Sequence, residues 1–174
     1  CNQGFDEFFG YLGQANAHFY WPQFLWSNHD RISLAGEAYS HDLITERALR
    51  FIRERSDRPF FLYLPYTIPH AELRVFEDEI LESYRALGWP ETPYHGSHYG
   101  DQPTPRAAFA AMITRMDRDI GRLFSTLQQL DVDEDTLVMF TSDNGPHGEG
   151  GADPGFFNSR GGLRGMKRDL YGGG

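Results

Sequence analysis

The sequence predicts an α/β fold in which helices flank a sheet of parallel strands. Two short runs of apolar residues, 59–66 and 136–141, are typical of strands buried on both faces of a sheet. A helical pattern precedes each run, so the order is helix, strand, helix, strand. Strands this apolar, separated by helices, favour parallel pairing. Two strands alone do not make such a sheet, so we expect the chain to be part of a larger domain.

Three helices are expected from caps and periodicity. The first begins at Ser40, which we interpret as its N-cap, and the second covers about 74–86. The third follows Thr104, interpreted as an N-cap, with Pro105 at the first helical position. Its apolar residues repeat at steps of three and four: Phe109, Met112, Ile113, Met116, Ile120, Leu123, Leu127 and Leu130. We expect residues 1–36 to be mostly loop with short elements.

Composition narrows the class of protein. A chain of 174 residues with 40% hydrophobic residues can fold around a core. Its formal net charge of −9 argues against nucleic acid or an anionic membrane as a partner. The longest apolar runs fall far short of the roughly 18 residues of a membrane-spanning helix. Cys1 is the only cysteine, so no internal disulfide and no thiol metal cluster is possible.

Polar side chains follow both predicted strands. His70 comes after the first strand, and Asp143, Asn144 and His147 come after the second. Sites in parallel α/β sheets form beyond the carboxyl ends of the strands, so we expect these residues at one edge. Asp143 and Asn144 offer hard oxygen ligands suited to Ca²⁺ or Mg²⁺, although "DNG" also suits a simple turn.

Three other residues have a functional and a structural interpretation. His70 could be a general acid or a surface histidine, and Lys167 could be a solvated lysine. His18 lies among aromatic residues and could simply pack there. Glu149 and Asp153 could add carboxylates to a metal site, but they lie in a Gly-rich loop that is costly to order.

Five segments together resemble the sulfatase family, the formylglycine-dependent sulfuric ester hydrolases of the alkaline phosphatase-like superfamily. The segments are "GFDEFFGY", "YSHDLITERALRFI", "PFFLYLPYTIPHAE", "TLVMFTSDNGPHGEGG" and "LRGMKRDLY", and they occur in the family's order. The resemblance covers nearly all of residues 1–174. It implies a partial alkaline phosphatase-like parallel sheet flanked by helices, and hydrolysis of a sulfate ester to an alcohol or phenol plus sulfate.

The resemblance also implies roles for individual residues. Asp143 and Asn144 match two ligands of the divalent cation, usually Ca²⁺, with Mg²⁺ as the alternative. Lys167 matches the lysine that contacts the sulfate and its bridging oxygen. His70 matches the histidine that lies on the sulfate and protonates the leaving group. A cation, Lys167 and a protonated His70 would stabilise the charge that develops as the S–O bond breaks.

Two further histidines are assigned to the substrate side of this site. His18 lies near the position of a substrate-side histidine, and His147 follows the metal ligands in "SDNGPH". The implied partner is a sulfated small molecule or glycan. The implied compartment is secreted, periplasmic or lysosomal, and the oligomeric state is left open.

The chain also departs from the family pattern. It has no Cys-x-Pro-Ser-Arg motif, whose cysteine becomes the formylglycine nucleophile, and Cys1 does not fit that motif. The family's early Asp-Asp ligands and Gly-Lys-Trp-His segment are also missing, and Gly172 stands where members usually have glutamate. We therefore expect residues 1–174 to be a partial catalytic domain without its nucleophile segment, inactive alone.

Two alternatives to a sulfatase remain open. One is a phosphodiesterase or phosphonate hydrolase of the same superfamily, which would carry a Thr or Ser nucleophile. The other is a non-catalytic fragment or pseudo-sulfatase that only binds its ligand.

Overall fold

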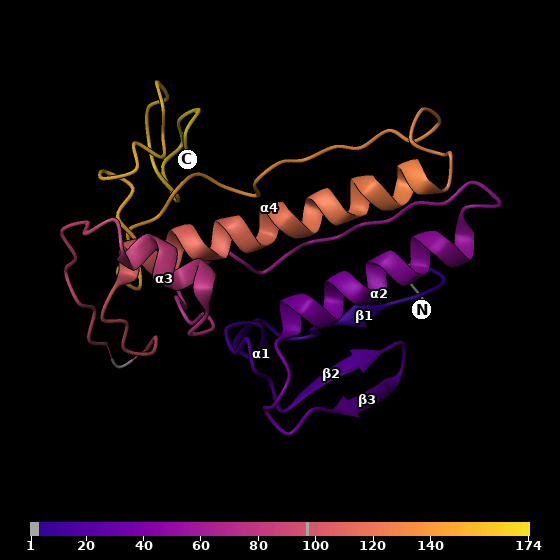
Figure 1. Cartoon of the computed structure of the whole chain (residues 1–174), viewed down its shortest axis with the longest axis horizontal. Helices are drawn as coiled ribbons and strands as arrows, with labels where there is room; N and C mark the ends of the chain where they lie inside the picture. The colour runs from indigo at the N-terminus through magenta and orange to yellow at the C-terminus, as the bar shows by residue number, and fades with distance from the viewer. Residues whose placement is uncertain (1–3, 97) are drawn as a thin grey trace. The chain divides into compact units, whose positions relative to one another are not determined.

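The computed structural model describes residues 4–96 and 98–174, so Cys1 lies outside the described residues. Its elements, labelled in Figure 1, fall into two compact units. The first unit runs up to Ile68 and includes Asp117–Leu137, and the second comprises Pro69–Met116 and Val138–Gly174. Helix α4, Pro105–Gln129, contributes its N-terminal half to the second unit and its C-terminal half to the first.

The first unit contains a three-stranded antiparallel sheet of order β1-β2-β3. The strands are β1 (Phe9–Gly10), β2 (Phe24–Ser27) and β3 (Asp30–Ser33). A two-residue turn joins β2 to β3, and its Asn28 has a left-handed backbone with φ of 54°. Asparagine tolerates this conformation, which the tight hairpin turn requires. These strands lie in the part that the sequence predicted to be mostly loop.

The predicted strands at 59–66 and 136–141 are wrong, because neither segment pairs with another strand. Among the described residues the one sheet is antiparallel, so the predicted parallel sheet is not confirmed. Burial on both faces is also wrong: Phe61 is 73% exposed and Met139 is 81% exposed. Residues 60–66 alternate between half-buried and exposed, as the two faces of a strand do. An apolar run shows that a segment suits a buried strand, but not which strands pair with it.

Helix α2, Ser40–Arg55, confirms the first predicted helix, and a short helix α1, Gln14–Ala17, precedes it. The N-cap of α2 is Tyr39, so the assignment of Ser40 as the cap is wrong. Ser40 is buried in the first turn, where its backbone N–H donates to the Tyr20 carbonyl at 2.8 Å. A backbone hydrogen bond from another part of the unit therefore satisfies an N–H group at this helix end, where a capping side chain was expected.

The second predicted helix, 74–86, forms only over Glu79–Arg85, the third forms as predicted, and both have caps that the sequence did not show. Helix α3, Glu79–Arg85, begins after Asp78, whose carboxylate accepts from the N–H groups of Ile80 and Leu81. At the start of α4, the Glu91 carboxylate accepts from the N–H groups of the first turn at 2.9 Å. The Thr104 hydroxyl, predicted as this cap, instead accepts from Arg85. Its carbonyl still accepts the first helical hydrogen bond.

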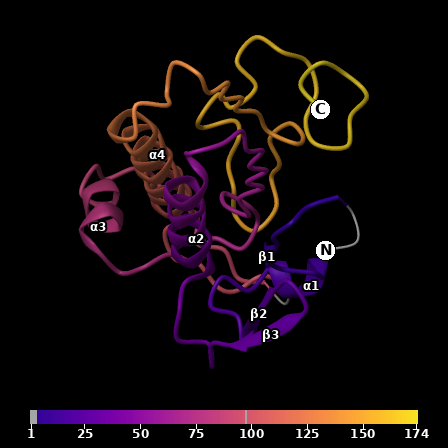
Figure 2. The same ribbon diagram turned by 90° about the vertical axis from the view of Figure 1, so that its right-hand side faces the viewer.

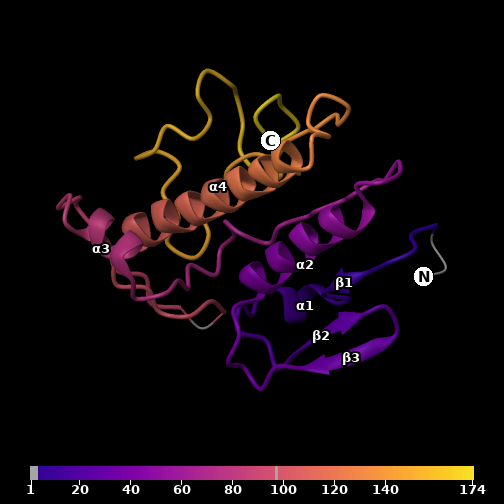
Figure 3. The same cartoon turned by 45° about the vertical axis from the view of Figure 1, so that its right-hand side comes forward.

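Within the first unit, α2 packs between the sheet and the C-terminal half of α4. Figure 2 shows the two helices side by side, and Figure 3 shows the sheet on the other side of α2. The contact is made by buried apolar residues of α2 and by one buried polar pair. His41 Nε2 lies 3.0 Å from an Asp119 carboxylate oxygen, and both side chains are fully buried.

Asp119 is the charged centre of this helix contact. Burial alone would raise its pKa, but hydrogen bonds from His41 and Arg118 hold the pKa well below its usual range. Arg122 also bonds to Asp119 and pairs with Glu46 of α2. The carboxylate therefore ties α2 to α4 as an anion with several partners, which is the condition for burying a charge.

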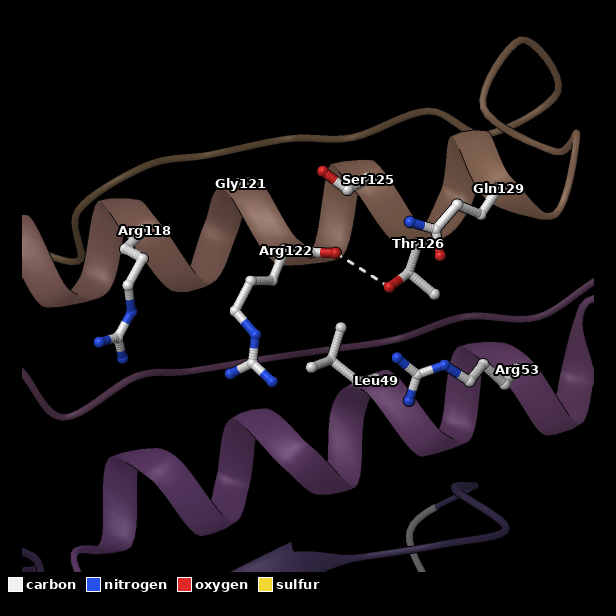
Figure 4. Close-up of a pocket in the computed structure, with 8 residues that line it drawn as sticks. All are labelled: Leu49, Arg53, Arg118, Gly121, Arg122, Ser125, Thr126 and Gln129. Atoms are coloured by element: carbon white, nitrogen blue, oxygen red, sulfur yellow. Dashed lines mark hydrogen bonds between the residues drawn. The ribbon is translucent and has the colours of Figure 1, made fainter.

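A groove of ≈ 450 Å³ runs along the same two helices (Figure 4). Its lining comprises Leu49 and Arg53 of α2 with Arg118, Gly121, Arg122, Ser125, Thr126 and Gln129 of α4. Two of its three arginines are already neutralised by Asp119 and Glu46. The groove holds none of the predicted site residues. No helix among the described residues is long and apolar enough to cross a membrane.

We predict that Asp119→Ala lowers the free energy of unfolding by about 3 kcal/mol, because it leaves buried His41 without its partner. The depressed pKa means that Asp119 stabilises the fold above about pH 4, its unfolded pKa, and that this stability is lost as the pH falls further. Urea denaturation at pH 7 and pH 3 measures both effects. Exposed Asp117 on α4 provides the matched control, and an equal loss in Asp117→Ala would contradict the assignment.

Candidate functional site

Three of the predicted residues meet in the second unit, from loops far apart in sequence. Lys167 Nζ lies 3.4 Å from His70 Nε2, although 97 positions separate them. The rings of His70 and His147 lie 5.5 Å apart, centroid to centroid. A lysine, which the sequence alone would leave solvated, is therefore half-buried against a histidine.

The hydrogen bond between Lys167 and His70 fixes a direction. An ammonium group can only donate, so a charged Lys167 donates to His70 in the tautomer whose Nε2 has no hydrogen. The protonated His70 that the resemblance implied stays a prediction. Lys167 is also the sequence's one lysine, since the other 15 of its 16 basic Lys and Arg residues are arginine.

His147 is oriented by its own loop. Its Nδ1 accepts from the Glu149 backbone N–H at 3.1 Å, so in the neutral ring the hydrogen is on Nε2. Burial lowers the pKa of His147, and the Lys167 charge lowers it further, so the ring is neutral at pH 7. Nε2 is itself buried, with no hydrogen-bond partner among the described residues. A buried N–H in this state is a donor suited to a ligand oxygen.

His147 also connects this group to a cavity. A cavity of ≈ 580 Å³ is lined by Asp143, Asn144 and His147, whereas His70 and Lys167 are not part of its wall. The rest of the wall is formed by Pro69, Phe109, Thr141, Ser142, Gly145, Pro146, Ala152, Asp153, Pro154, Ser159, Arg160, Leu163 and Gly172–Gly174. The predicted metal pair therefore faces the same space as His147.

Backbone contacts hold the loops that carry these residues. The Lys167 N–H donates to the Pro146 carbonyl at 2.9 Å, which joins the lysine loop to the His147 loop. Gly150 joins the same loop to the His70 segment: a Cβ at this position would lie 1.8 Å from the Ala71 carbonyl oxygen. Gly150 also has a φ of +66°, which glycine adopts without strain. Position 150 therefore requires glycine for two reasons.

The loop after residue 152 is anchored to α4. Asp153 pairs with Arg106 at 2.6 Å, and its carboxylate also accepts from the Phe156 N–H at 2.9 Å. Phe157 packs on Phe109 of α4 with ring centroids 5.5 Å apart. These contacts explain how a Gly-rich segment can form one wall of a cavity without regular secondary structure.

The donor set does not make a complete Ca²⁺ site. Asp143 is exposed, and the Asn144 amide donates to the Gly145 carbonyl at 3.2 Å. Among the described residues, no group of three or more His, Cys, Asp or Glu side chains is placed to hold a metal ion. Glu149 and Asp153, the possible extra ligands, are paired with Arg168 and Arg106. Ca²⁺ takes about six to eight oxygen ligands, so the two residues do not suffice.

His18 belongs to the first unit, where it ends α1, and its substrate-side role stays a prediction. A Cβ at Gly172 would meet no heavy atom within 4 Å, so packing does not require glycine there. The sequence did not predict that Glu149 and Arg168 form an ion pair beside Lys167. The "GEGG" sequence at 148–151 was a signal of tight backbone packing that could have pointed to this loop.

Comparison with known proteins gives a family. The family model described as Sulfatase matches residues 1–174. The chain is 24% identical over 188 residues to an arylsulfatase of Klebsiella aerogenes, covering 83% of this chain and 40% of the relative. It is 29% identical over 173 residues to human steryl-sulfatase, covering 96% of this chain and 24% of the relative.

A third relative has a broader name. The multifunctional alkaline phosphatase superfamily protein of Trinickia caryophylli is 30% identical over 135 residues, covering 58% of this chain and 26% of the relative. The chain thus spans less than half the length of each of these curated relatives.

We predict that Gly150→Ala displaces the His147 loop and lowers the free energy of unfolding by about 1–3 kcal/mol, because it adds left-handed strain and a clash with Ala71. Thermal denaturation and the NMR signals of the two histidine rings measure the effect. Gly162→Ala is the control, since a Cβ there meets no atom within 4 Å. Equal behaviour of the two variants would refute the packing role of Gly150.

Proposed function

The chain belongs to the sulfatase family, and on this basis we propose that its second unit contributes part of a site that hydrolyses sulfate esters. Sulfate ester hydrolysis is the reaction of the family. The observation that carries the proposal is the hydrogen bond between Lys167 and His70, with His147 beside them. A cationic group, a histidine and a neutral donor meet there, and His147 also lines the cavity that Asp143 and Asn144 face.

The chemistry of a sulfate ester requires these three kinds of group. Its sulfate carries one negative charge, and charge builds on the bridging oxygen as the S–O bond breaks. The positive charge of Lys167 lies near that oxygen until its proton is transferred, and a preorganised charge there stabilises the transition state. The buried N–H of His147 donates to a non-bridging sulfate oxygen and orients the group.

Lys167 and His70 act together in proton transfer. The leaving alcohol or phenol departs as an anion unless it receives a proton, and a placed acid supplies one. Lys167 gives one of its ammonium protons to the bridging oxygen as the S–O bond breaks and becomes a neutral amine, which then regains a proton from water by way of His70 Nε2. A lysine is suited to this step, whereas an arginine does not release its proton.

The nucleophile is proposed to lie outside residues 1–174. Among these residues we find no Cys-x-Pro-Ser-Arg motif, and the proposed roles of His70, Lys167 and His147 are those of proton relay, cationic proton donor and hydrogen-bond donor. The covalent step needs an activated nucleophile. A formylglycine would supply it in a sulfatase, so the 174 residues alone should show no turnover.

Asp143 and Asn144 are proposed as two ligands of a divalent cation, Ca²⁺ or Mg²⁺. A bound cation would supply Lewis-acid stabilisation of the sulfate oxygens. Because the described residues provide only these two oxygen donors, the remaining ligands would come from other residues of the complete protein.

A second candidate is a phosphodiesterase or phosphonate hydrolase of the same superfamily. The chain is similar to the Trinickia caryophylli protein, whose name describes it as multifunctional, and this similarity supports the second candidate function. A Thr or Ser nucleophile in the full gene product would support this candidate, and a formylglycine would support the sulfatase. A full gene product with neither, and without activity, would be a pseudo-sulfatase. The ester is proposed to be a sulfated small molecule or glycan.

We predict that Lys167→Ala and Lys167→Arg each lower kcat/KM for 4-nitrophenyl sulfate by about 10²- to 10⁴-fold. Both substitutions remove the proton donor, and Lys167→Ala also removes the positive charge. The assay uses the full gene product, coexpressed with the formylglycine-generating enzyme. Arg164→Gln changes a cation three residues away and serves as the control. Wild-type turnover by Lys167→Ala would exclude the proposed role, while an active Lys167→Arg variant would reduce it to electrostatics.

We predict that the 174-residue chain binds Ca²⁺ weakly or not at all, because one carboxylate and one amide provide few of the about six to eight ligands. Isothermal titration calorimetry of the chain and of Asp143→Ala measures this affinity. A sub-micromolar dissociation constant that Asp143→Ala abolishes would mean that the chain carries a complete metal site.

A further inference from the structure

We propose that Glu149 and Arg168 are positioning residues, whose ion pair holds Lys167 against His70. This inference rests on the proposed function of Lys167. Arg168 Nη2 lies 2.6 Å from a Glu149 carboxylate oxygen, directly beside Lys167 in the chain. The two residues therefore join the loop that carries Lys167 to the loop that carries His147.

Glu149 acts on both sides of the site through two different groups. Its backbone N–H bonds to His147 Nδ1, which leaves the His147 hydrogen on Nε2. Its carboxylate binds Arg168, one residue after Lys167. Movement of this one residue would therefore disturb the histidine donor and the lysine together.

The backbone of Arg168 supports a holding role. Its φ is +81°, a left-handed conformation that an arginine adopts only at a conformational cost. The conformation persists where surrounding contacts hold it. Two such contacts are the Glu149 ion pair and, one residue earlier, the hydrogen bond from the Lys167 N–H to the Pro146 carbonyl.

The charges around Glu149 favour the pair. Arg168 donates to the carboxylate and holds the pKa of Glu149 below its usual range, and the Arg168 and Lys167 charges act in the same direction. The Tyr99 side chain also contacts Glu149, and its ring packs on His70. Glu149 is thus an anion placed among the groups of the site, and not an isolated surface charge.

The competing explanation is an ordinary surface ion pair that stabilises the loop and nothing else. The Arg168 side chain is 72% exposed, and exposed pairs contribute little to stability. Loss of such a pair would change the melting temperature slightly and leave the NMR signals of the His70 ring nitrogens unchanged. The proposal requires that loss of the pair be felt at the contact between Lys167 and His70.

The test uses the fact that Lys167 is the one lysine. Labelling with ¹⁵N-lysine and ¹⁵N-histidine gives one side-chain lysine signal and the ring signals of His70 in the 174-residue chain. Lys167→Ala defines the His70 signal when the contact is lost. Arg168→Gln and Glu149→Gln should both shift His70 Nε2 towards that value, and the double variant should shift it no further than either single variant.

Two further variants separate positioning from general effects. Arg168→Lys keeps the charge and should restore part of the wild-type His70 signal. Arg164→Gln removes a cation from the same loop, one that donates to the Tyr171 hydroxyl, and it should leave the His70 signal unchanged. An unchanged His70 signal in both Arg168→Gln and Glu149→Gln, or an equal shift in Arg164→Gln, would overturn the proposal.

Activity of the full gene product distinguishes this inference from the proposed function. Arg168→Gln should lower kcat/KM about fivefold, the factor that corresponds to ~1 kcal/mol for a partly exposed pair. If Lys167→Ala is fully active, the proposed function fails whatever the NMR signals show. If Lys167→Ala is inactive while Arg168→Gln is fully active with an unchanged His70 signal, the positioning role alone fails.

Discussion

The close approach of the Gly150 backbone to the Ala71 carbonyl is the constraint on which the candidate site depends. No regular strand carries His70, His147 or Lys167, so their positions come from contacts between loops. Gly150 sets the distance between the His147 loop and the His70 segment, because any side chain there would meet the Ala71 oxygen. The hydrogen bond from Lys167 to Pro146 then places the lysine loop on the same frame.

The distribution of charge within the second unit follows from this frame. Arginines form the structural ion pairs, as Arg106 does with Asp153 and Arg168 does with Glu149. The single lysine is instead used where it meets a histidine. This division is chemically sensible, since arginine keeps its proton and suits permanent pairs, whereas lysine can give one up. His147 adds a neutral donor and no further positive charge.

The sequence predicted the helices well and their ends poorly. Apolar spacing over many residues identified α2 and α4, because one face of each helix must be buried. Caps depend on single contacts, and Glu91 reaches the start of α4 from a preceding loop that no local pattern connects to it.

The same limit applies to the prediction of the candidate site. The motifs pointed to His70, Lys167 and His147, whereas Glu149 and Arg168 become visible only when two loops are seen together. Membership of the sulfatase family implies an alkaline phosphatase-like α/β fold. The helices and small antiparallel sheet are compatible with that class, and the parallel sheet stays a prediction.

A site made by loops responds to sequence change differently from a site at a sheet edge. Strands hold their ends through many ladder hydrogen bonds, so one substitution seldom moves them. Here a few contacts fix each catalytic candidate, and His147 and Lys167 share Glu149 and Pro146 as neighbours. Residues that never touch a substrate can therefore alter the distance between Lys167 and His70. The half-exposed loops also have few buried apolar contacts of their own, which is typical of segments with low local stability. The geometry of this candidate site is then set as much by the packing of glycines and ion pairs as by His70, His147 and Lys167 themselves.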